Sequence, residues 1–203
     1  MAIINSKDIG NISLLQKQLQ EQPNNQVNRL ALTFALLNAE QYQAAREEIK
    51  TLRQQAPQRI DYVIAQADIE LADNQPKVAL ELLQQALLLN PHNDALRFYA
   101  ASAAIKNQEY SMALIWLTPL SYERPEDPNV WQKLIEVYQT QKDALNLLRA
   151  RAEFSFLLGD IDKALKDLEQ AKNLAQNNYP LLAKISSRQQ VLLEIKANTK
   201  KLR

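Results

Sequence analysis

The chain has 203 residues, 46% of them hydrophobic, and a formal net charge of +1 from 24 basic and 23 acidic side chains. This charge balance gives no electrostatic argument for binding nucleic acid or an anionic membrane, and no apolar run is long enough to predict a transmembrane helix. The lack of cysteine excludes disulfides and thiolate metal sites, while only 2 glycines among many leucines, alanines and glutamines predict an almost wholly helical protein.

The first expected helix covers residues 11–22, where Ile12, Leu15 and Leu19 share one face. It corresponds to the second helix of an incomplete repeat that occupies residues 1–25. Three full helix–turn–helix repeats are expected next, at residues 26–59, 60–93 and 94–127. Short polar residues expected as N-caps are Asn24, Asn93 or Asp94, and Asp127. Prolines expected in a first helical turn are Pro76 and Pro128.

Prolines recur at a fixed interval of 34 residues, at Pro23, Pro57, Pro91 and Pro125. Small residues occupy the positions where paired helices would cross, and these are expected to be buried: Ala45, Ala67, Ala79, Ala86, Ala101 and Ala113. A period of about 34 residues with helix–turn–helix content is typical of tetratricopeptide (TPR) repeats. The sequence therefore predicts an all-α TPR α-solenoid, a right-handed superhelix of about eleven antiparallel helices.

The repeat register changes beyond residue 128. Ala164 and Ala171 mark a second-type helix, which places the start of its repeat near Leu145, about half a period early. We therefore expect residues 144–158 to pair with both the preceding and the following helix, with a tight turn at Gly159. A last helix is expected from Pro180 to about Asn198. In this interpretation residues 1–203 form a single TPR solenoid, with half-period-shifted repeats at 128–178 and a capping helix at 179–203.

The sequence predicts no catalytic chemistry. His92 is the single histidine and is expected to be an exposed turn residue. HExxH, nucleophile-elbow and glycine-rich phosphate motifs do not occur in it. We therefore expect no catalytic residue, no cofactor and no metal site in this chain.

A repeat array of this kind binds partners mainly on the concave wall formed by the first helix of each pair. Inward-facing positions there mix aromatic rings with both charge signs, and they are predicted to bind a protein partner: Phe34, Asp61, Asp68, Phe98, Tyr99, Lys106 and Lys133. It is equally open that Phe98 or Tyr99 packs against a neighbouring helix instead. A competing surface lies near the C-terminus, at Arg149, Arg151, Glu153 and the tail 196–203.

A narrower pattern runs from Leu147 to Leu182. It contains Arg-Ala-Arg-Ala-Glu-Phe, then Leu-Leu-Gly-Asp, then Ala-Leu-x-x-Leu-Glu-Gln-Ala, and finally Asn-Asn-Tyr. This pattern resembles the end of the C-terminal TPR region of BepA-type, HtpX-like periplasmic zinc metallopeptidases. The zinc protease domain of that family is missing from this sequence, so no catalytic or metal-binding residue is carried over.

The resemblance implies that the chain is an excised TPR domain of a periplasmic metallopeptidase and chaperone in outer-membrane protein assembly and quality control. Any zinc would then belong to the parent protease domain. The implied partners are proteins: the outer-membrane β-barrel assembly machinery or its clients, and the attached protease domain. The alternative is a free-standing TPR adaptor in a cytoplasmic or secretion-related complex. An RNA- or peptidoglycan-associated TPR protein is disfavoured by the net charge of +1.

Overall fold

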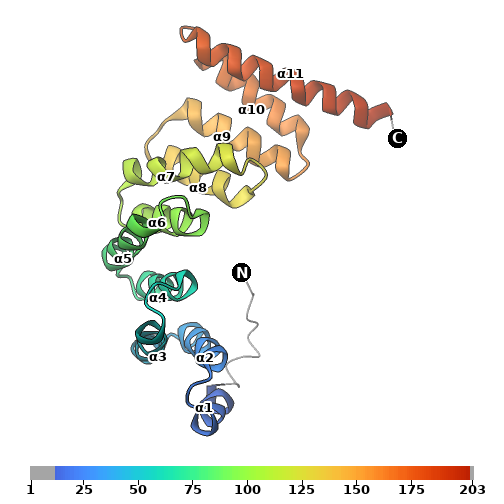
Figure 1. Cartoon of the computed structure of the whole chain (residues 1–203). Helices are drawn as coiled ribbons and strands as arrows, with labels where there is room; N and C mark the ends of the chain where they lie inside the picture. The colour runs from blue at the N-terminus through green and yellow to red at the C-terminus, as the bar shows by residue number, and fades with distance from the viewer. Residues whose placement is uncertain (1–11, 202–203) are drawn as a thin grey trace. The chain divides into compact units, whose positions relative to one another are not determined.

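The computed structural model describes residues 12–201, which hold eleven helices and no strand (Figure 1). The all-α TPR fold predicted from the sequence is therefore confirmed. The helices are α1 (Ile12–Glu21), α2 (Gln26–Asn38), α3 (Tyr42–Gln55), α4 (Ile60–Ala72), α5 (Pro76–Leu89), α6 (Asp94–Lys106), α7 (Tyr110–Glu123), α8 (Pro128–Thr140), α9 (Ala144–Leu157), α10 (Ile161–Leu174) and α11 (Tyr179–Lys201).

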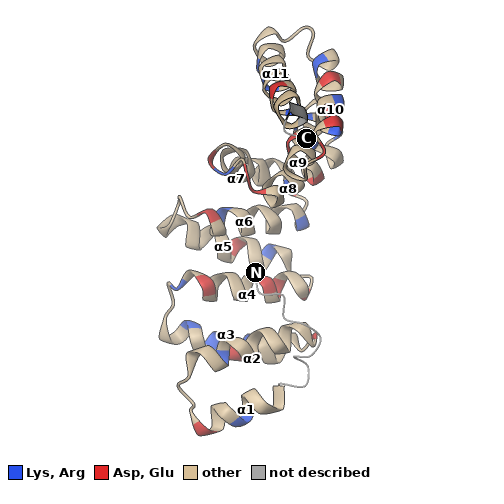
Figure 2. Cartoon of the chain, turned by 90° about the vertical axis from the view of Figure 1, so that its right-hand side faces the viewer, with Lys and Arg blue, Asp and Glu red and all other residues tan. Residues whose placement is uncertain are grey.

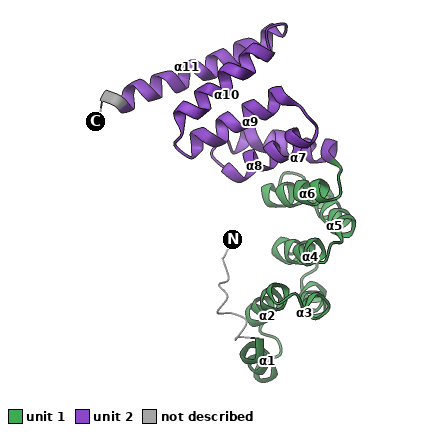
Figure 3. Cartoon of the chain, turned by 180° about the vertical axis from the view of Figure 1, so that it is seen from behind, with its two compact units in different colours: residues 1–109 green, residues 110–203 purple. Residues whose placement is uncertain are grey.

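The chain divides into two compact units, residues 1–109 and residues 110–203 (Figure 3). Unit 1 holds α1 to α6, and unit 2 holds α7 to α11. The assignment of residues 1–203 to a single solenoid, with the repeat boundaries given above, stays a prediction. Residues 1–11, which include the expected helix start at Asn11, and residues 202–203 of the tail lie outside the described part of the chain.

The periodic prolines stand at the second position of the turns that enter α2, α4, α6 and α8. In each turn the residue two places after the proline donates its N–H to the carbonyl of the residue before the proline. These bonds are Asn25 to Gln22 (3.1 Å), Arg59 to Ala56 (3.2 Å), Asn93 to Asn90 (3.1 Å) and Asp127 to Arg124 (3.1 Å). Proline suits this position because its ring fixes φ near the value that the turn needs. The 34-residue period is thus a period of turns.

A second set of turns follows the same period, and each contains one residue in the left-handed region. These residues are Glu40 (φ 59°), Asn74 (φ 56°), Gln108 (φ 62°), Lys142 (φ 57°) and Gly159 (φ 84°). The next residue in each case donates its N–H to a carbonyl five positions back, as in Asp143 to Tyr138 at 2.9 Å and Asp160 to Ser155 at 2.9 Å. This is the Schellman arrangement that ends a helix.

The register of these turns changes once. The first four are spaced by 34 residues, whereas Gly159 follows Lys142 by 17, half a period. As a result, α9 packs against both α8 and α10. Asp160 then caps α10, its side chain accepting from the Lys163 N–H at 3.0 Å.

The expected helix caps are mostly found. Asn93 and Asp127 cap α6 and α8, and Pro76 and Pro128 occupy the first turns of α5 and α8. The expected cap Asn24 is wrong by one residue. Asn25 caps α2, and its side chain accepts a hydrogen bond from the Asn28 N–H at 3.1 Å. The cap falls at this residue because the proline turn covers residues 22–25, so the helix begins only after Asn25.

Small residues line the helix crossings in both units, as predicted. Positions with no exposed surface are Ala45, Ala67, Ala79, Ala101, Ala113, Ala164 and Ala171. Such side chains allow two helix backbones to approach closely. The exception is Ala86, which is only half-buried and lies beside a surface hollow with Arg53 and Ile60. It lies in the last turn of α5, just before the Pro91 turn.

Candidate functional site

The surface predicted on the first helices of unit 1 is formed by α2, α4 and α6, which lie side by side. Phe34 on α2 is partly buried against the N-terminal core cluster, so most of its ring is core. Asp61 is exposed at the start of α4 and accepts two bonds from the Arg59 Nε, at 2.9 and 3.1 Å. Lys106 is exposed at the end of α6. Partner binding by these residues stays a prediction.

Asp68 on α4 and the ring pair Phe98 and Tyr99 on α6 form the centre of this surface. The two rings meet edge to face, with centroids 6.0 Å apart. Burial raises the pKa of Asp68 to about 6, and burial together with the nearby Asp68 charge raises the pKa of Tyr99. A half-buried carboxylate beside two half-buried aromatic rings is an arrangement suited to anchoring a partner side chain.

Replacing Asp68 by asparagine is expected to raise the free energy of unfolding by about 1–2 kcal/mol at about pH 8, and by almost nothing at about pH 4. The folded chain holds the Asp68 proton up to about pH 6, whereas the carboxyl's ordinary pKa is 3.8. The contribution of Asp68 to the free energy of unfolding is therefore fully present below pH 3.8, where its carboxyl group is protonated in both states. This contribution is lost as the pH rises through about 6, because the folded chain must then bury a charged carboxylate.

Urea unfolding at the two pH values, followed by far-UV circular dichroism, measures this difference. Asp61→Asn on the same helix is the control, because its carboxylate is exposed. An Asp68→Asn variant that gains as much stability at about pH 4 as at about pH 8 would contradict the burial of an ionised Asp68.

A groove of about 310 Å³ opens in unit 2, and we call it the α7–α11 groove. Its rim and walls carry three aromatic and three basic side chains, namely Tyr122, Trp131, Tyr138, Arg149, Lys184 and Arg188. Leu134, Leu168 and Ile185 form its apolar floor. Basic and acidic residues are scattered over the helices of both units, so this basic lining is a local feature (Figure 2).

Two of the three basic side chains of the groove, Arg149 and Arg188, are held by defined partners. Asp143 accepts from the Asn146 amide at 2.8 Å, and the Asn146 carbonyl oxygen accepts from Arg149 Nη1 at 2.9 Å. Arg188 of α11 donates to both Glu153 oxygens, with Nε bonds of 2.9 and 3.2 Å and an Nη2 bond of 2.6 Å. The Arg188 guanidinium also lies 4.9 Å from the centre of the Phe156 ring. These contacts tie α9 to α11 across one wall.

The aromatic side of the groove comes from α7 and α8. The Trp131 indole N–H donates to the Pro125 carbonyl at 2.8 Å, and Tyr138 lines the groove together with Thr118. Burial raises the pKa of Tyr138. Pro119 lies inside α7, where it cannot donate a backbone hydrogen bond, and Tyr122 stands in the last turn of the same helix. Tyr122 is 70% exposed.

The competing C-terminal surface is divided by the structure. Arg149 and Glu153 line the α7–α11 groove, whereas Arg151 pairs with Asp167 of α10 at 3.4 Å, on the side of α9 that faces α10. Lys196 pairs with Asp162. Lys133 pairs with Glu136 one turn on at 3.1 Å. The residues that sequence reasoning missed are the groove's Tyr122, Trp131, Tyr138, Lys184 and Arg188.

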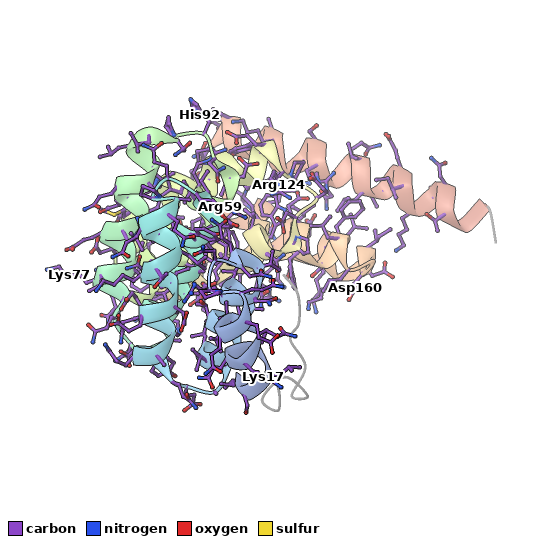
Figure 4. All side chains as sticks on the ribbon, turned by 60° about the horizontal axis from the view of Figure 1, so that its bottom comes forward. Lys17, Arg59, Lys77, His92, Arg124 and Asp160 are labelled. Carbon is purple, nitrogen blue, oxygen red and sulfur yellow. The ribbon has the colours of Figure 1, made fainter. Side chains whose placement is uncertain are left out.

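Two further observations concern the described residues alone. No group of three or more side chains there could hold a metal ion, and no helix there is long and apolar enough to span a membrane. His92 is exposed in the turn between α5 and α6, as predicted, and points away from the ribbon in Figure 4.

Paired helices that present an aromatic surface and a mixed groove define a helical-repeat protein of the protein-binding class. The profile of the tetratricopeptide repeat family matches residues 12–69 and 70–135, and the chain belongs to that family.

Relatives with curated names are β-barrel assembly-enhancing proteases. The protein from Yersinia pestis is 29% identical over 136 residues, which cover 67% of this chain and 28% of the relative. The protein from Escherichia coli K12 is 26% identical over 137 residues, covering 68% and 28%. The resemblance to this protease family is thereby confirmed, and the chain spans less than a third of the length of these relatives.

Solved structures share the fold. MamA from Desulfovibrio magneticus RS-1, residues 41 to the end, superposes with a TM-score of 0.61 at 16% identity, covering 76% of this chain and 86% of that one. A tetratricopeptide repeat protein from Parabacteroides merdae gives 0.61 at 12% identity, covering 91% and 78%. At these identities the likeness concerns the fold alone.

Proposed function

We propose that this chain is the protein-docking domain of a periplasmic metallopeptidase and chaperone that acts in outer-membrane protein assembly and quality control. The observation that carries the proposal is the 29% identity, over 136 residues, with a β-barrel assembly-enhancing protease. In this role the chain binds and positions, and the peptidase chemistry belongs to a separate zinc domain.

The partners in this proposal are proteins: the outer-membrane β-barrel assembly machinery or its clients, and the attached protease domain. Two surfaces support it. The α4–α6 surface offers Asp68, Phe98 and Tyr99, and the α7–α11 groove offers aromatic walls with basic side chains. Buried aromatic anchors surrounded by charged residues are the usual energetic centres of protein interfaces. Two such surfaces would allow the chain to hold two partners at once.

A binding assay with the purified chain and the detergent-solubilised β-barrel assembly complex tests the proposal. The parent chain is expected to retain the complex, and Tyr99→Ala, Lys133→Glu or Arg149→Glu to weaken retention. Lys166→Glu is the matched control, since this exposed lysine of α10 lies outside both surfaces. Each variant must keep the parent's helicity.

A parent chain that does not retain the complex would overturn the proposed function. If Tyr99→Ala and Lys133→Glu bind like the parent while Arg149→Glu does not, the predicted concave site is wrong and the groove takes its place.

A further inference from the structure

We propose that the α7–α11 groove binds an internal segment of a partner protein in which an acidic side chain stands next to a large aromatic or aliphatic one. This inference deepens the proposed function and rests on it only for the statement that the partner is a protein. It assigns the groove a ligand chemistry that follows from its own lining.

The charge of the groove favours an acidic ligand. It is lined by Arg149, Lys184 and Arg188 against the single acid Glu153, and Glu153 is already engaged by Arg188 through three hydrogen bonds. Within the described residues, no carboxylate lies at ion-pair distance from Arg149 or Lys184. Two cations thus face the groove without a counter-charge, and a guanidinium and an ammonium together match one or two carboxylates.

The apolar part of the groove favours a large neighbouring side chain. Tyr122 stands 70% exposed at the rim, and Trp131 and Tyr138 form the adjacent wall above the buried Leu134 and Ile185. Covering these rings removes apolar area from water and allows ring-on-ring contact. A volume of about 310 Å³ is at the lower end of the range for ligand sites, so it suits one or two anchor side chains.

Three of the recognition groups, Arg149, Arg188 and Trp131, are already held in place. Arg149 is oriented by Asn146, which is itself held by Asp143, the N-cap residue of α9. Arg188 is held by Glu153 and by the Phe156 ring, and the Trp131 ring by its bond to the Pro125 carbonyl. Side chains that are fixed before binding lose little conformational freedom on binding, which favours a specific ligand over a general one.

Affinity selection from a phage-displayed library of short random segments tests the inference. Every segment is flanked by glycine and serine, so that no free C-terminal carboxylate is offered. The 203-residue chain is expected to enrich segments with Asp or Glu beside Trp, Tyr, Phe or Leu. Selection on Arg149→Glu/Lys184→Glu is expected to lose these segments, and one amidated synthetic peptide from the enriched set is expected to bind this variant at least about tenfold more weakly.

Lys163→Glu/Lys166→Glu, two exposed lysines of α10 outside the groove, changes the net charge by the same amount; tested with the same peptide, it is expected to bind like the parent. Enrichment of basic segments, no enrichment, or equal binding by Arg149→Glu/Lys184→Glu would overturn the proposal. The proposal would also be overturned if the parent dimerised in a concentration-dependent way and the Arg149→Glu/Lys184→Glu variant did not, because a second copy of the chain would then fill the groove. If the chain selects acidic–aromatic segments but does not retain the assembly complex, the ligand proposed for the groove still holds and the proposed function is overturned.

Discussion

Replacing Arg46 by alanine is expected to lower the free energy of unfolding by about 2–4 kcal/mol. Arg46 on α3 donates to both carboxylate oxygens of Glu70 on α4, with a shortest bond of 2.8 Å, and to Asp73 at 2.5 Å. The Glu70 side chain is only 7% exposed, so the substitution leaves a buried carboxylate without its counter-charge. The expected loss is below that of a fully buried pair because Arg46 itself is 26% exposed.

Urea unfolding of the parent, Arg46→Ala, and the double variant Arg46→Met/Glu70→Met measures this effect. The double variant removes the charges together and is expected to lose less stability than Arg46→Ala alone, because no buried charge remains unpaired. Equal losses in the two variants would mean that Glu70 finds water or another donor in the absence of Arg46. In that case the pair would contribute no more than an exposed one, at most about 1 kcal/mol.

The fold could be predicted because its signals are local and repeated. Pro23, Pro57, Pro91 and Pro125 each stand at the second position of a four-residue turn, and Ala45, Ala79 and Ala113 each occupy one crossing. A single proline or alanine would have indicated little, but the common period fixes the register. Ala86 shows where this reasoning fails, since it is only half-buried whereas Leu52 and Leu120, one repeat before and after it, have no exposed surface.

The candidate site could be predicted only in part. Asp68 and Tyr99 could be placed on one surface because the repeat register puts both on first helices, and the Asp68 charge does act on Tyr99; that this surface binds a partner stays a prediction. The groove was missed because its walls come from five helices, α7 to α11, where the register changes at Gly159.

One signal for the groove was present in the sequence. Trp131, Leu134 and Tyr138 follow i, i+3, i+7 spacing and therefore share one face of α8. In a regular repeat that face would pack against the neighbouring helices. Here it is partly left open and lines the α7–α11 groove together with Tyr122, which is 70% exposed.

Replacing Ala79 by leucine is expected to lower the free energy of unfolding of unit 1 by about 1–3 kcal/mol. Ala79 has no exposed surface and lies on α5, which packs against both α4 and α6. Three additional carbon atoms at this crossing force the helix backbones apart or push the leucine into a strained rotamer. Thermal and urea unfolding followed by far-UV circular dichroism measure the loss.

Lys77→Leu on the same helix is the matched control, because this exposed side chain points away from the ribbon (Figure 4). It adds a leucine of the same size to solvent-facing surface and is expected to change stability by less than about 0.5 kcal/mol. If Ala79→Leu unfolds like the parent, α4 and α6 can move away from α5 at no cost in stability. The close approach of the helices would then not explain why alanine recurs at these positions. If both variants are destabilised equally, the effect would come from leucine in α5 itself and not from the crossing.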